Sequence, residues 1–158
     1  MRDYTVKDVA RAVRFACVVH AGQVDKGGEP YAEHPTRVAL RLVRWPLAAV
    51  AGALHDVVED TGVTVAEVEA DFGPEVAAAV DALTRRKSEL GPWPHRESDY
   101  EYMARVLVNP VARAVKRADA EDNLDESRLS ALPPRMAGRL RAKYTRMLAF
   151  LDGEEEAL

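Results

Sequence analysis

The segment PLAAVAGALHDVVEDTG, residues 46–62, joins an apolar helical pattern to a dense group of charges. Its proline suits the first turn of a helix, where the missing backbone N–H is tolerated. Apolar residues then recur at the spacing of one helix face, at Ala49, Val50, Ala53, Leu54 and Val57. The segment therefore predicts one buried helix, from Pro46 to near Gly62, with its charged residues in the last turns.

The charged end of this helix carries four ionisable side chains, His55, Asp56, Glu59 and Asp60. Helical spacing puts His55 on one face with Glu59, and Asp56 on one face with Asp60. Carboxylates this close repel one another unless a cation, a base or solvent offsets their charge. Two interpretations follow: a solvated helix end, or a site for a divalent metal such as Zn, Mn, Fe or Ni, which histidine and carboxylate ligands suit.

Two distant residues support the metal interpretation. His34 precedes a proline after a glycine-rich loop, and Asp119 continues an apolar helical stripe that faces the core. An acid on a core-facing stripe needs a partner. A site with two histidines and two carboxylates, drawn from three helices, is therefore predicted at His34, His55, Asp56 and Asp119. Such a site leaves coordination positions open for water and substrate.

The rest of the chain also has a helical pattern, without repeats or low-complexity linkers. Helices are expected over residues 5–20, 35–42, 46–62, 64–72, 74–84, 98–108, 110–124 and 134–151. Residues 21–33 predict a loop, and the proline-containing residues 86–98 predict a mobile loop. No strand is expected, so the fold class is all-α, an irregular helical bundle. We expect a single domain over residues 1–158, with its core at about 9–151 and an acidic tail at 152–158.

Composition narrows the possible partners and compartments. The 158 residues include 26 acids and 22 bases, and this mildly acidic balance argues against nonspecific nucleic-acid binding. Cys17 is the only cysteine, so an intramolecular disulfide is impossible. No apolar run reaches the length of a membrane span, and the N-terminus lacks the apolar core of a signal peptide. We therefore expect a cytoplasmic protein with neither nucleic-acid nor membrane partners, of undetermined oligomeric state.

Several motifs together resemble the HD-domain hydrolases of the RelA/SpoT type, and most closely the small stand-alone (p)ppGpp hydrolases. The matching segments occur in the family's order and include HAGQVDKGGEPYAEHPTRVA (20–39), AGALHDVVEDT (51–61), FGPEVAAAVDALT (72–84), YEYMARVLVNPVARAVKRADAEDNLD (100–125) and RLRAKY (139–144). The resemblance implies the all-α HD fold, one bound divalent ion, usually Mn²⁺, and hydrolysis of the 3′-diphosphate of (p)ppGpp to GDP or GTP plus pyrophosphate. The length leaves no room for a separate synthetase domain, so we expect no synthetase activity.

The resemblance also implies roles for nine residues. The metal ligands would be His34, His55, Asp56 and Asp119. The residues that orient or activate the attacking water would be Glu59 and Asp60. The residues that reach the nucleotide substrate would be Lys26 and Asn123. Lys116, one turn before Asp119, is interpreted either as a phosphate neighbour or as a solvated lysine.

Two departures from the family pattern keep other functions open. Asp25 stands where the hydrolases usually have the first of two basic residues, which stacks on guanine, and an acid there would also repel phosphates. Asp122 stands where the related segment commonly has a histidine before Asn123. The alternatives are an HD-domain phosphohydrolase that acts on another nucleotide or diphosphate, and a non-catalytic nucleotide-sensing module.

Overall fold

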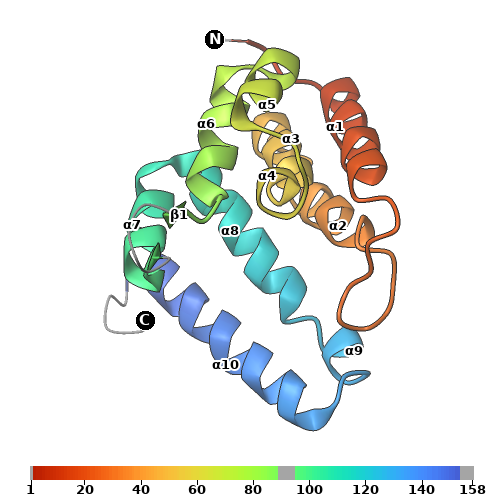
Figure 1. Cartoon of the computed structure of the whole chain (residues 1–158), viewed down its shortest axis with the longest axis vertical. Coiled ribbons are helices and arrows are strands. Elements are labelled where there is room, and N and C mark those ends of the chain that lie inside the picture. Colours follow the sequence, from red (N-terminus) through yellow and green to blue (C-terminus); the bar gives the residue numbers. More distant parts are fainter. Residues whose placement is uncertain (1, 89–94, 154–158) are drawn as a thin grey trace.

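A computed structural model describes residues 2–88 and 95–153 of the chain. These residues form ten helices and one pair of very short strands (Figure 1). The helices are α1 (Val6–Val19), α2 (Glu33–Arg41), α3 (Pro46–Leu54), α4 (Val57–Asp60), α5 (Val65–Phe72), α6 (Pro74–Leu83), α7 (Asp99–Val108), α8 (Pro110–Asn123), α9 (Glu126–Leu129) and α10 (Pro134–Leu151). The strands are β1 (Lys87–Ser88) and β2 (His95–Arg96). The all-α prediction is therefore confirmed.

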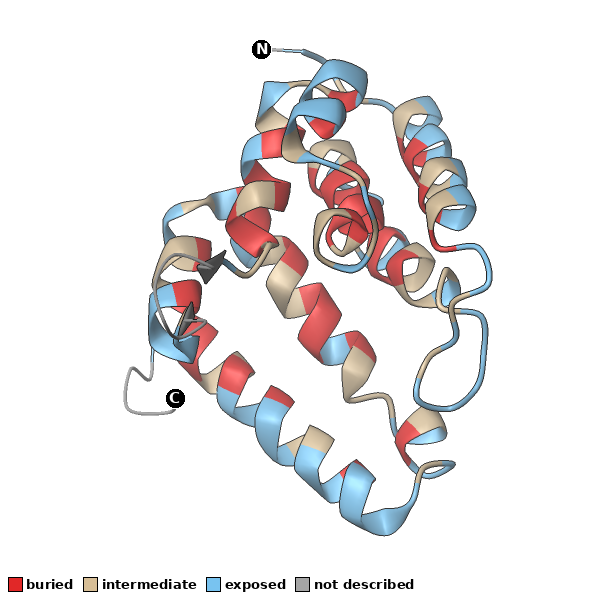
Figure 2. Ribbon diagram, viewed as in Figure 1, coloured by how far each residue is buried: buried red, intermediate tan, exposed pale blue. Residues whose placement is uncertain are grey.

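Helix α3 lies at the centre of the bundle. It packs against α1, α2, α6 and α8, and every residue from Ala48 to Leu54 is buried. Figure 2 shows that the buried residues of α6 and α8 face it. Its small side chains let the neighbouring helices approach closely. A Cβ atom on Gly52 would lie 3.3 Å from side-chain carbons of both Val38 and Leu42, so α2 and α3 fit together at a glycine.

Helix α8 connects the two halves of the fold. It packs against α2, α3 and α6 on one side, and against α7 and α10 on the other (Figure 1). Helix α10 buries one stripe, Ala137, Tyr144, Met147, Phe150 and Leu151, and exposes much of the rest (Figure 2). The short helix α9 links α8 to α10, so the C-terminal half of α8 lies between α2 and α10.

The predicted single helix over residues 46–62 is wrong in its second half. Helix α3 ends at Leu54, and α4 begins only at Val57. The His55 ring donates from Nδ1 to the Gly52 carbonyl oxygen at 2.8 Å, and Asp56, at φ −105° and ψ −6°, is the N-cap residue of α4. The helix therefore bends at the His-Asp pair, and the i,i+4 argument that placed His55 beside Glu59 does not apply.

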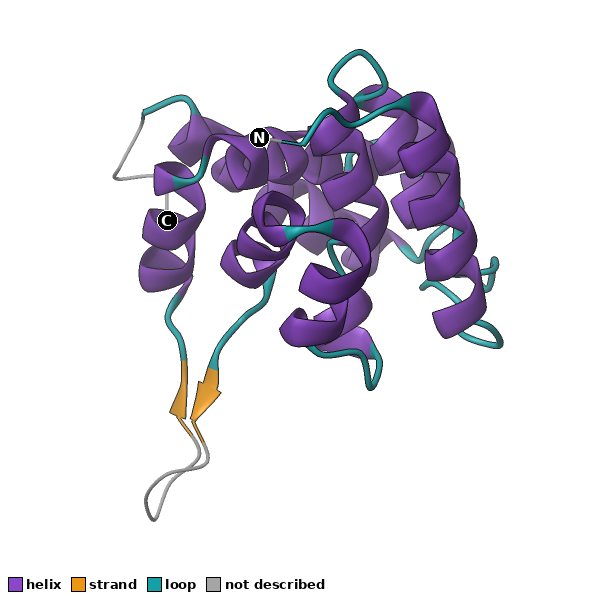
Figure 3. Ribbon diagram, turned by 90° about the horizontal axis from the view of Figure 1, so that it is seen from above, coloured by secondary structure: helices purple, strands orange, loops and turns teal. Residues whose placement is uncertain are grey.

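The other predicted helices agree with the structure to within about two residues, because their caps are strong local signals. Thr64 and Ser98 each form the capping box that their sequences predict. Two elements were not predicted: α9, and the antiparallel pair that joins Lys87 to Arg96 and Ser88 to His95. Figure 3 shows this strand pair projecting from the helical body. The predicted mobile loop includes residues 89–94, which lie outside the described residues.

None of the helices in residues 2–88 and 95–153 is both long and apolar enough to cross a membrane.

The junction between α5 and α6 depends on Gly73. Its φ of 95° and ψ of 163° belong to a backbone region that is essentially open to glycine alone, and an added Cβ would lie 2.8 Å from the Tyr4 hydroxyl. That hydroxyl donates to the Phe72 carbonyl oxygen at 2.9 Å. We expect Gly73→Ala to lower the free energy of unfolding by about 1–3 kcal/mol, measured by urea denaturation. The matched control is Gly138→Ala in α10, where space is open and alanine should stabilise by about 0.5–1 kcal/mol. Equal stabilities for the two variants would contradict this prediction.

Candidate functional site

A cavity of about 540 Å³ opens between the loop before α2, the α3–α4 junction, α8 and α10. All nine residues that the sequence predicts for the site line this cavity: Lys26, His34, His55, Asp56, Glu59, Asp60, Lys116, Asp119 and Asn123. They come from segments that are up to 97 residues apart, between positions 26 and 123. The tertiary fold therefore assembles the predicted set in one place.

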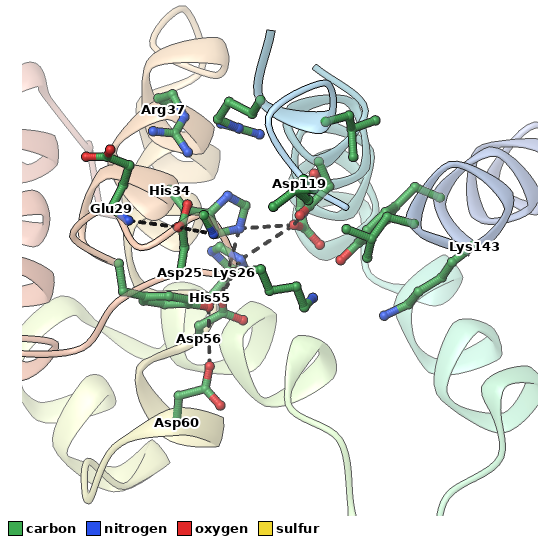
Figure 4. Close-up of a pocket in the computed structure, with 18 of the residues that line it drawn as sticks. Asp25, Lys26, Glu29, His34, Arg37, His55, Asp56, Asp60, Asp119 and Lys143 are labelled. Carbon is green, nitrogen blue, oxygen red and sulfur yellow. Dashed lines mark hydrogen bonds and ion pairs between the residues drawn. The ribbon is translucent and has the colours of Figure 1, made fainter. Parts of the chain in front are cut away.

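The two histidines and two aspartates converge in the cavity (Figure 4). Nε2 of His55 lies 2.9 Å from Oδ2 of Asp56 and 4.0 Å from Oδ1 of Asp119. Nε2 of His34 lies 3.2 Å from the same Asp119 oxygen and 3.9 Å from Asp56 Oδ2. His34, His55 and Asp56 each offer a ligand atom, and these atoms lie within 4.8 Å of one another. The spacing suits a single divalent ion after small side-chain movements.

Each histidine is held through its other ring nitrogen. Nδ1 of His55 donates to the Gly52 carbonyl oxygen at 2.8 Å, and Nδ1 of His34 donates to Oδ2 of Asp122 at 2.9 Å. In the neutral imidazole this leaves the Nε2 lone pair free to face the aspartates. Within the described part of the chain, Nε2 of His55 is buried and has no hydrogen-bond partner. A buried imidazole nitrogen that makes no hydrogen bond, yet lies 2.9 Å from one carboxylate oxygen and 4.0 Å from another, fits a metal ligand.

The charges of this cluster balance without an ion. Burial lowers the pKa of His34, but hydrogen bonds to Asp119 and Asp122 outweigh it and raise that pKa to about 9. Burial raises the pKa of Asp119, but Lys116 and His34 hold it well below its usual range. Lys116 donates to Oδ2 of Asp119 at 2.8 Å. An ion would displace protons from the imidazoles, because metal-bound histidine must be neutral at the ligating nitrogen.

The acidic pair after the His-Asp motif lies beside the aspartate cluster. Burial, and then the charges of Asp56 and Glu59, raise the pKa of Asp60. The hydroxyl of Tyr31 lies 2.5 Å from Oδ2 of Asp56 and 3.3 Å from Oδ2 of Asp60, and so bridges the two. Tyr31 was not predicted, although its position three residues before His34 could have drawn attention to it.

Glu59 is held from the opposite side of the site. Its Oε2 accepts a hydrogen bond from the backbone N–H of Arg85 at 3.1 Å. Arg105 fixes the chain there, because its guanidinium donates to the carbonyl oxygens of Asp81 at 2.9 Å and Thr84 at 3.0 Å. The structure therefore positions the Glu59 carboxylate through the segment that follows α6.

The three residues predicted to bind substrate take up different positions. Asn123 donates from Nδ2 to Asp119, both to its carbonyl oxygen and to Oδ1, at 2.9 and 2.6 Å. Lys116 is paired with the other oxygen of Asp119, as described above. Asn123 and Lys116 thus orient an aspartate as well as lining the cavity. Lys26 lines the cavity from the loop before α2.

Positive side chains that were given no role in the sequence face the cluster from the other walls. Arg85, Arg128 and Lys143 line the cavity, and Figure 4 shows Lys143 on the α10 side. Burial, and then repulsion from Lys116 and Lys26, lower the pKa of Lys143. The Lys143 side chain is therefore near the positive charges of Lys116 and Lys26. Lys143 lies in RLRAKY (139–144), one of the segments that resemble the family, and this resemblance could have identified it as a site residue.

Arg37 and Asp122 complete the inner wall. Arg37 lines the cavity, and its Nε donates to Asp122 Oδ1 at 3.2 Å. Asp122 is fully buried. Asp122 lies three residues after Asp119, and this spacing puts both side chains on one face of a helix. The sequence could therefore have predicted a second acid that points inward.

Comparisons with known proteins show the family to which the chain belongs. The HD domain family model matches residues 12–119. The probable guanosine-3′,5′-bis(diphosphate) 3′-pyrophosphohydrolase of Synechocystis sp. is 36% identical over 138 residues, which are 84% of this chain and 18% of that protein. The guanosine-3′,5′-bis(diphosphate) 3′-pyrophosphohydrolase of Aquifex aeolicus is 31% identical over 125 residues, 75% of this chain and 17% of that protein. The probable GTP pyrophosphokinase of Mycobacterium leprae is 34% identical over 135 residues, 83% and 17% of the two chains.

The chain therefore spans less than a fifth of the length of these curated relatives. A solved structure described as "A metazoan ortholog of SpoT hydrolyzes ppGpp and plays a role in starvation responses" is similar over 96% of this chain and 89% of its own. The TM-score is 0.73 at 23% sequence identity. This likeness supports the same all-α fold over nearly the whole chain.

Proposed function

Because the chain belongs to the HD domain family, we propose that it is a metal-dependent phosphohydrolase acting on guanosine-3′,5′-bis(diphosphate) in the cytoplasm. The reaction would release pyrophosphate from the 3′ position of this nucleotide. The observation that carries the proposal is the pairing of a two-histidine, two-aspartate cluster with lysines and arginines in one cavity. The names of the Synechocystis and Aquifex relatives support the substrate.

HD domains bind divalent metal ions, and the donor set of this chain fits one. The ligands would be His34, His55, Asp56 and Asp119, and we propose Mn²⁺ as the ion, since imidazole and carboxylate donors suit it. When bound, the ion supplies a Lewis acid that polarises a phosphate oxygen and makes a nearby water more acidic. The remaining steps belong to the protein's own side chains.

Glu59 and Asp60 would orient the attacking water and accept its proton. The raised pKa of Asp60 favours the uptake of a proton by its carboxylate, which suits a role beside Glu59 in accepting the proton of the water. The water oxygen would bond to the phosphorus attached to the ribose 3′ oxygen. The bond between that phosphorus and the 3′ oxygen breaks, and the released oxygen takes up a proton.

The positive side chains would hold the diphosphate. Lys26, Lys116 and Lys143 line the cavity with Arg128, and together they offset the charge that the phosphates carry. The positive charges of Lys116 and Lys26 lower the pKa of Lys143, so an anion between these side chains would relieve their repulsion. An anionic nucleotide is therefore the favoured small-molecule partner.

The orientation of Asp25 reduces one objection to this substrate, the repulsion between its carboxylate and the phosphates. Its Oδ1 accepts hydrogen bonds from the backbone N–H groups of Gly27 at 2.7 Å and Glu29 at 3.0 Å. The carboxylate therefore closes a turn in the loop that carries Lys26. Much of its charge is offset locally by these donors, so its repulsion of a phosphate is reduced.

A panel of substrates tests the proposal. The purified protein, loaded with Mn²⁺, is offered ppGpp, GTP, deoxynucleoside triphosphates and NADPH, and pyrophosphate and phosphate release are measured. We expect pyrophosphate and GDP from ppGpp, loss of this activity in excess EDTA, and recovery with added Mn²⁺. Turnover of another nucleotide alone would make the chain a phosphohydrolase of different specificity. A protein that neither binds metal nor turns over any of these compounds would instead be a non-catalytic module.

A further inference from the structure

Asp122 is an acid that the proposed reaction does not use. It lies on α8, three residues after Asp119, and is fully buried. Its Oδ2 accepts from Nδ1 of His34 at 2.9 Å and from Nη1 of Arg128 at 2.8 Å. Nε of Arg37 lies 3.2 Å from Oδ1 and 3.3 Å from Oδ2. Nε of Arg41 lies farther away, 3.7 Å from Oδ1. The carboxylate thus meets one imidazole and three guanidinium groups, from α2 and α9.

A buried carboxylate is costly unless its charge is offset and its oxygens are hydrogen-bonded. Arg37 and Arg128 supply that compensation for Asp122. Arg128 also donates from Nη2 to the Asp122 carbonyl oxygen, which joins α9 to the end of α8. Asp122 is therefore an ionised group in a fixed position.

This fixed charge acts on one ring of the candidate metal cluster. Nδ1 of His34 faces Asp122, while Nε2 of the same ring faces Asp119 at 3.2 Å. His55 has the same arrangement, except that its Nδ1 is held by the neutral Gly52 carbonyl oxygen. A carboxylate on the far nitrogen of a ligating histidine fixes its tautomer and orientation and raises its basicity.

We propose that Asp122 positions the His34 imidazole and makes its Nε2 a stronger ligand for a divalent cation, an inference that rests on the proposed function. Of the two histidines, His34 is the one whose support a side-chain substitution can remove, since a backbone carbonyl supports His55.

Asp122→Asn tests the inference, because asparagine keeps the shape and one oxygen acceptor but loses the charge. We expect the dissociation constant for Mn²⁺, measured by the electron paramagnetic resonance signal of free Mn²⁺, to rise about 10- to 100-fold. Hydrolysis should fall in the same proportion at low Mn²⁺ and recover largely at saturating Mn²⁺. Circular dichroism of the metal-free variant reports whether the helices are retained.

The matched control is Glu121→Gln, on the neighbouring residue of α8. It removes the same unit of charge from an exposed side chain whose closest cation is Arg41, at 4.0 Å. We expect its Mn²⁺ affinity to stay within about twofold of wild type, since no ligand depends on it. The double variant Asp122→Asn/Arg128→Gln gives a second test. It also removes an arginine that would otherwise lose its carboxylate partner, and so limits the loss of stability that this unpaired charge would cause.

Two results would overturn the inference. One is a folded Asp122→Asn protein, single or charge-balanced, that binds Mn²⁺ as tightly as wild type. The other is an equal loss of affinity in Glu121→Gln, which would indicate a general effect of charge. Failure of the proposed function is distinct, because it would appear as wild-type protein that binds Mn²⁺ yet turns over no ppGpp.

Discussion

Replacing Asp56 with alanine is expected to lower Mn²⁺-dependent hydrolysis by about a thousandfold or more. Asp56 lies at the bend between α3 and α4, with its Oδ2 at 2.9 Å from Nε2 of His55. Its removal takes away one of the two carboxylates of the cluster, so we also expect Mn²⁺ binding to weaken by about a hundredfold or more. Affinity for Mn²⁺ and release of pyrophosphate from ppGpp are the two measurements.

The fold should survive this change. The loss of Asp56 relieves its repulsion with Asp119, and the Tyr31 hydroxyl keeps Asp60 as an acceptor. The buried Nε2 of His55 loses a carboxylate at 2.9 Å, so we expect the free energy of unfolding of the metal-free protein to fall by about 1–3 kcal/mol. The control is Asp71→Ala, which removes an exposed carboxylate paired with Arg11. Activity retained in a folded Asp56→Ala protein would show that the metal site is wrongly assigned.

Replacing Glu59 with glutamine should separate chemistry from metal binding. The amide oxygen can still accept from the Arg85 backbone N–H, so the side chain keeps its position but can no longer take a proton. We expect kcat to fall about 10²- to 10⁴-fold. The Mn²⁺ dissociation constant should stay within about twofold of wild type, since Glu59 lies outside the group of candidate ligands.

The comparison of the two variants is the informative result. Asp56→Ala should lose metal and activity together, whereas Glu59→Gln should lose activity alone. Glu69→Gln, on the exposed side of α5, serves as the control for loss of a carboxylate. A normal kcat in Glu59→Gln would assign the water to Asp60, and Asp60→Asn would then carry the loss. A parallel loss of Mn²⁺ affinity would instead make Glu59 a ligand.

Most helices could be predicted from the sequence because their ends carry local signals. Thr64 and Ser98 accept from backbone N–H groups three residues ahead, and proline opens α3, α6, α8 and α10. The bend at His55 could not be predicted in this way. It accompanies a bond between an imidazole and a backbone carbonyl, and the apolar periodicity continues through it to Val57. Helix α9 has four residues, too few for a periodic pattern.

The candidate ligands could be identified from the sequence because acids on core-facing stripes need partners. Tyr31 and Asp122 were given no role, since their roles depend on contacts across 25 and 88 residues. Asp25 shows a different limit. Its charge suggested repulsion of phosphate, but its side chain bonds to the backbone two and four residues ahead, and residue type alone did not distinguish these outcomes.

The central position of α3 has a consequence for how a cation is captured. Four helices surround α3, and His55 follows directly at its end, buried and bonded to Gly52. The ring is therefore immobilised when the chain folds, and an incoming cation need not order it. Rigid ligands lower the entropic cost of binding and favour ions whose preferred bond lengths match the space available. The buried alanines of α3 fix how closely the neighbouring helices approach, and so fix the place of His55. The preference among divalent ions would then depend in part on packing at a distance from the ligands themselves.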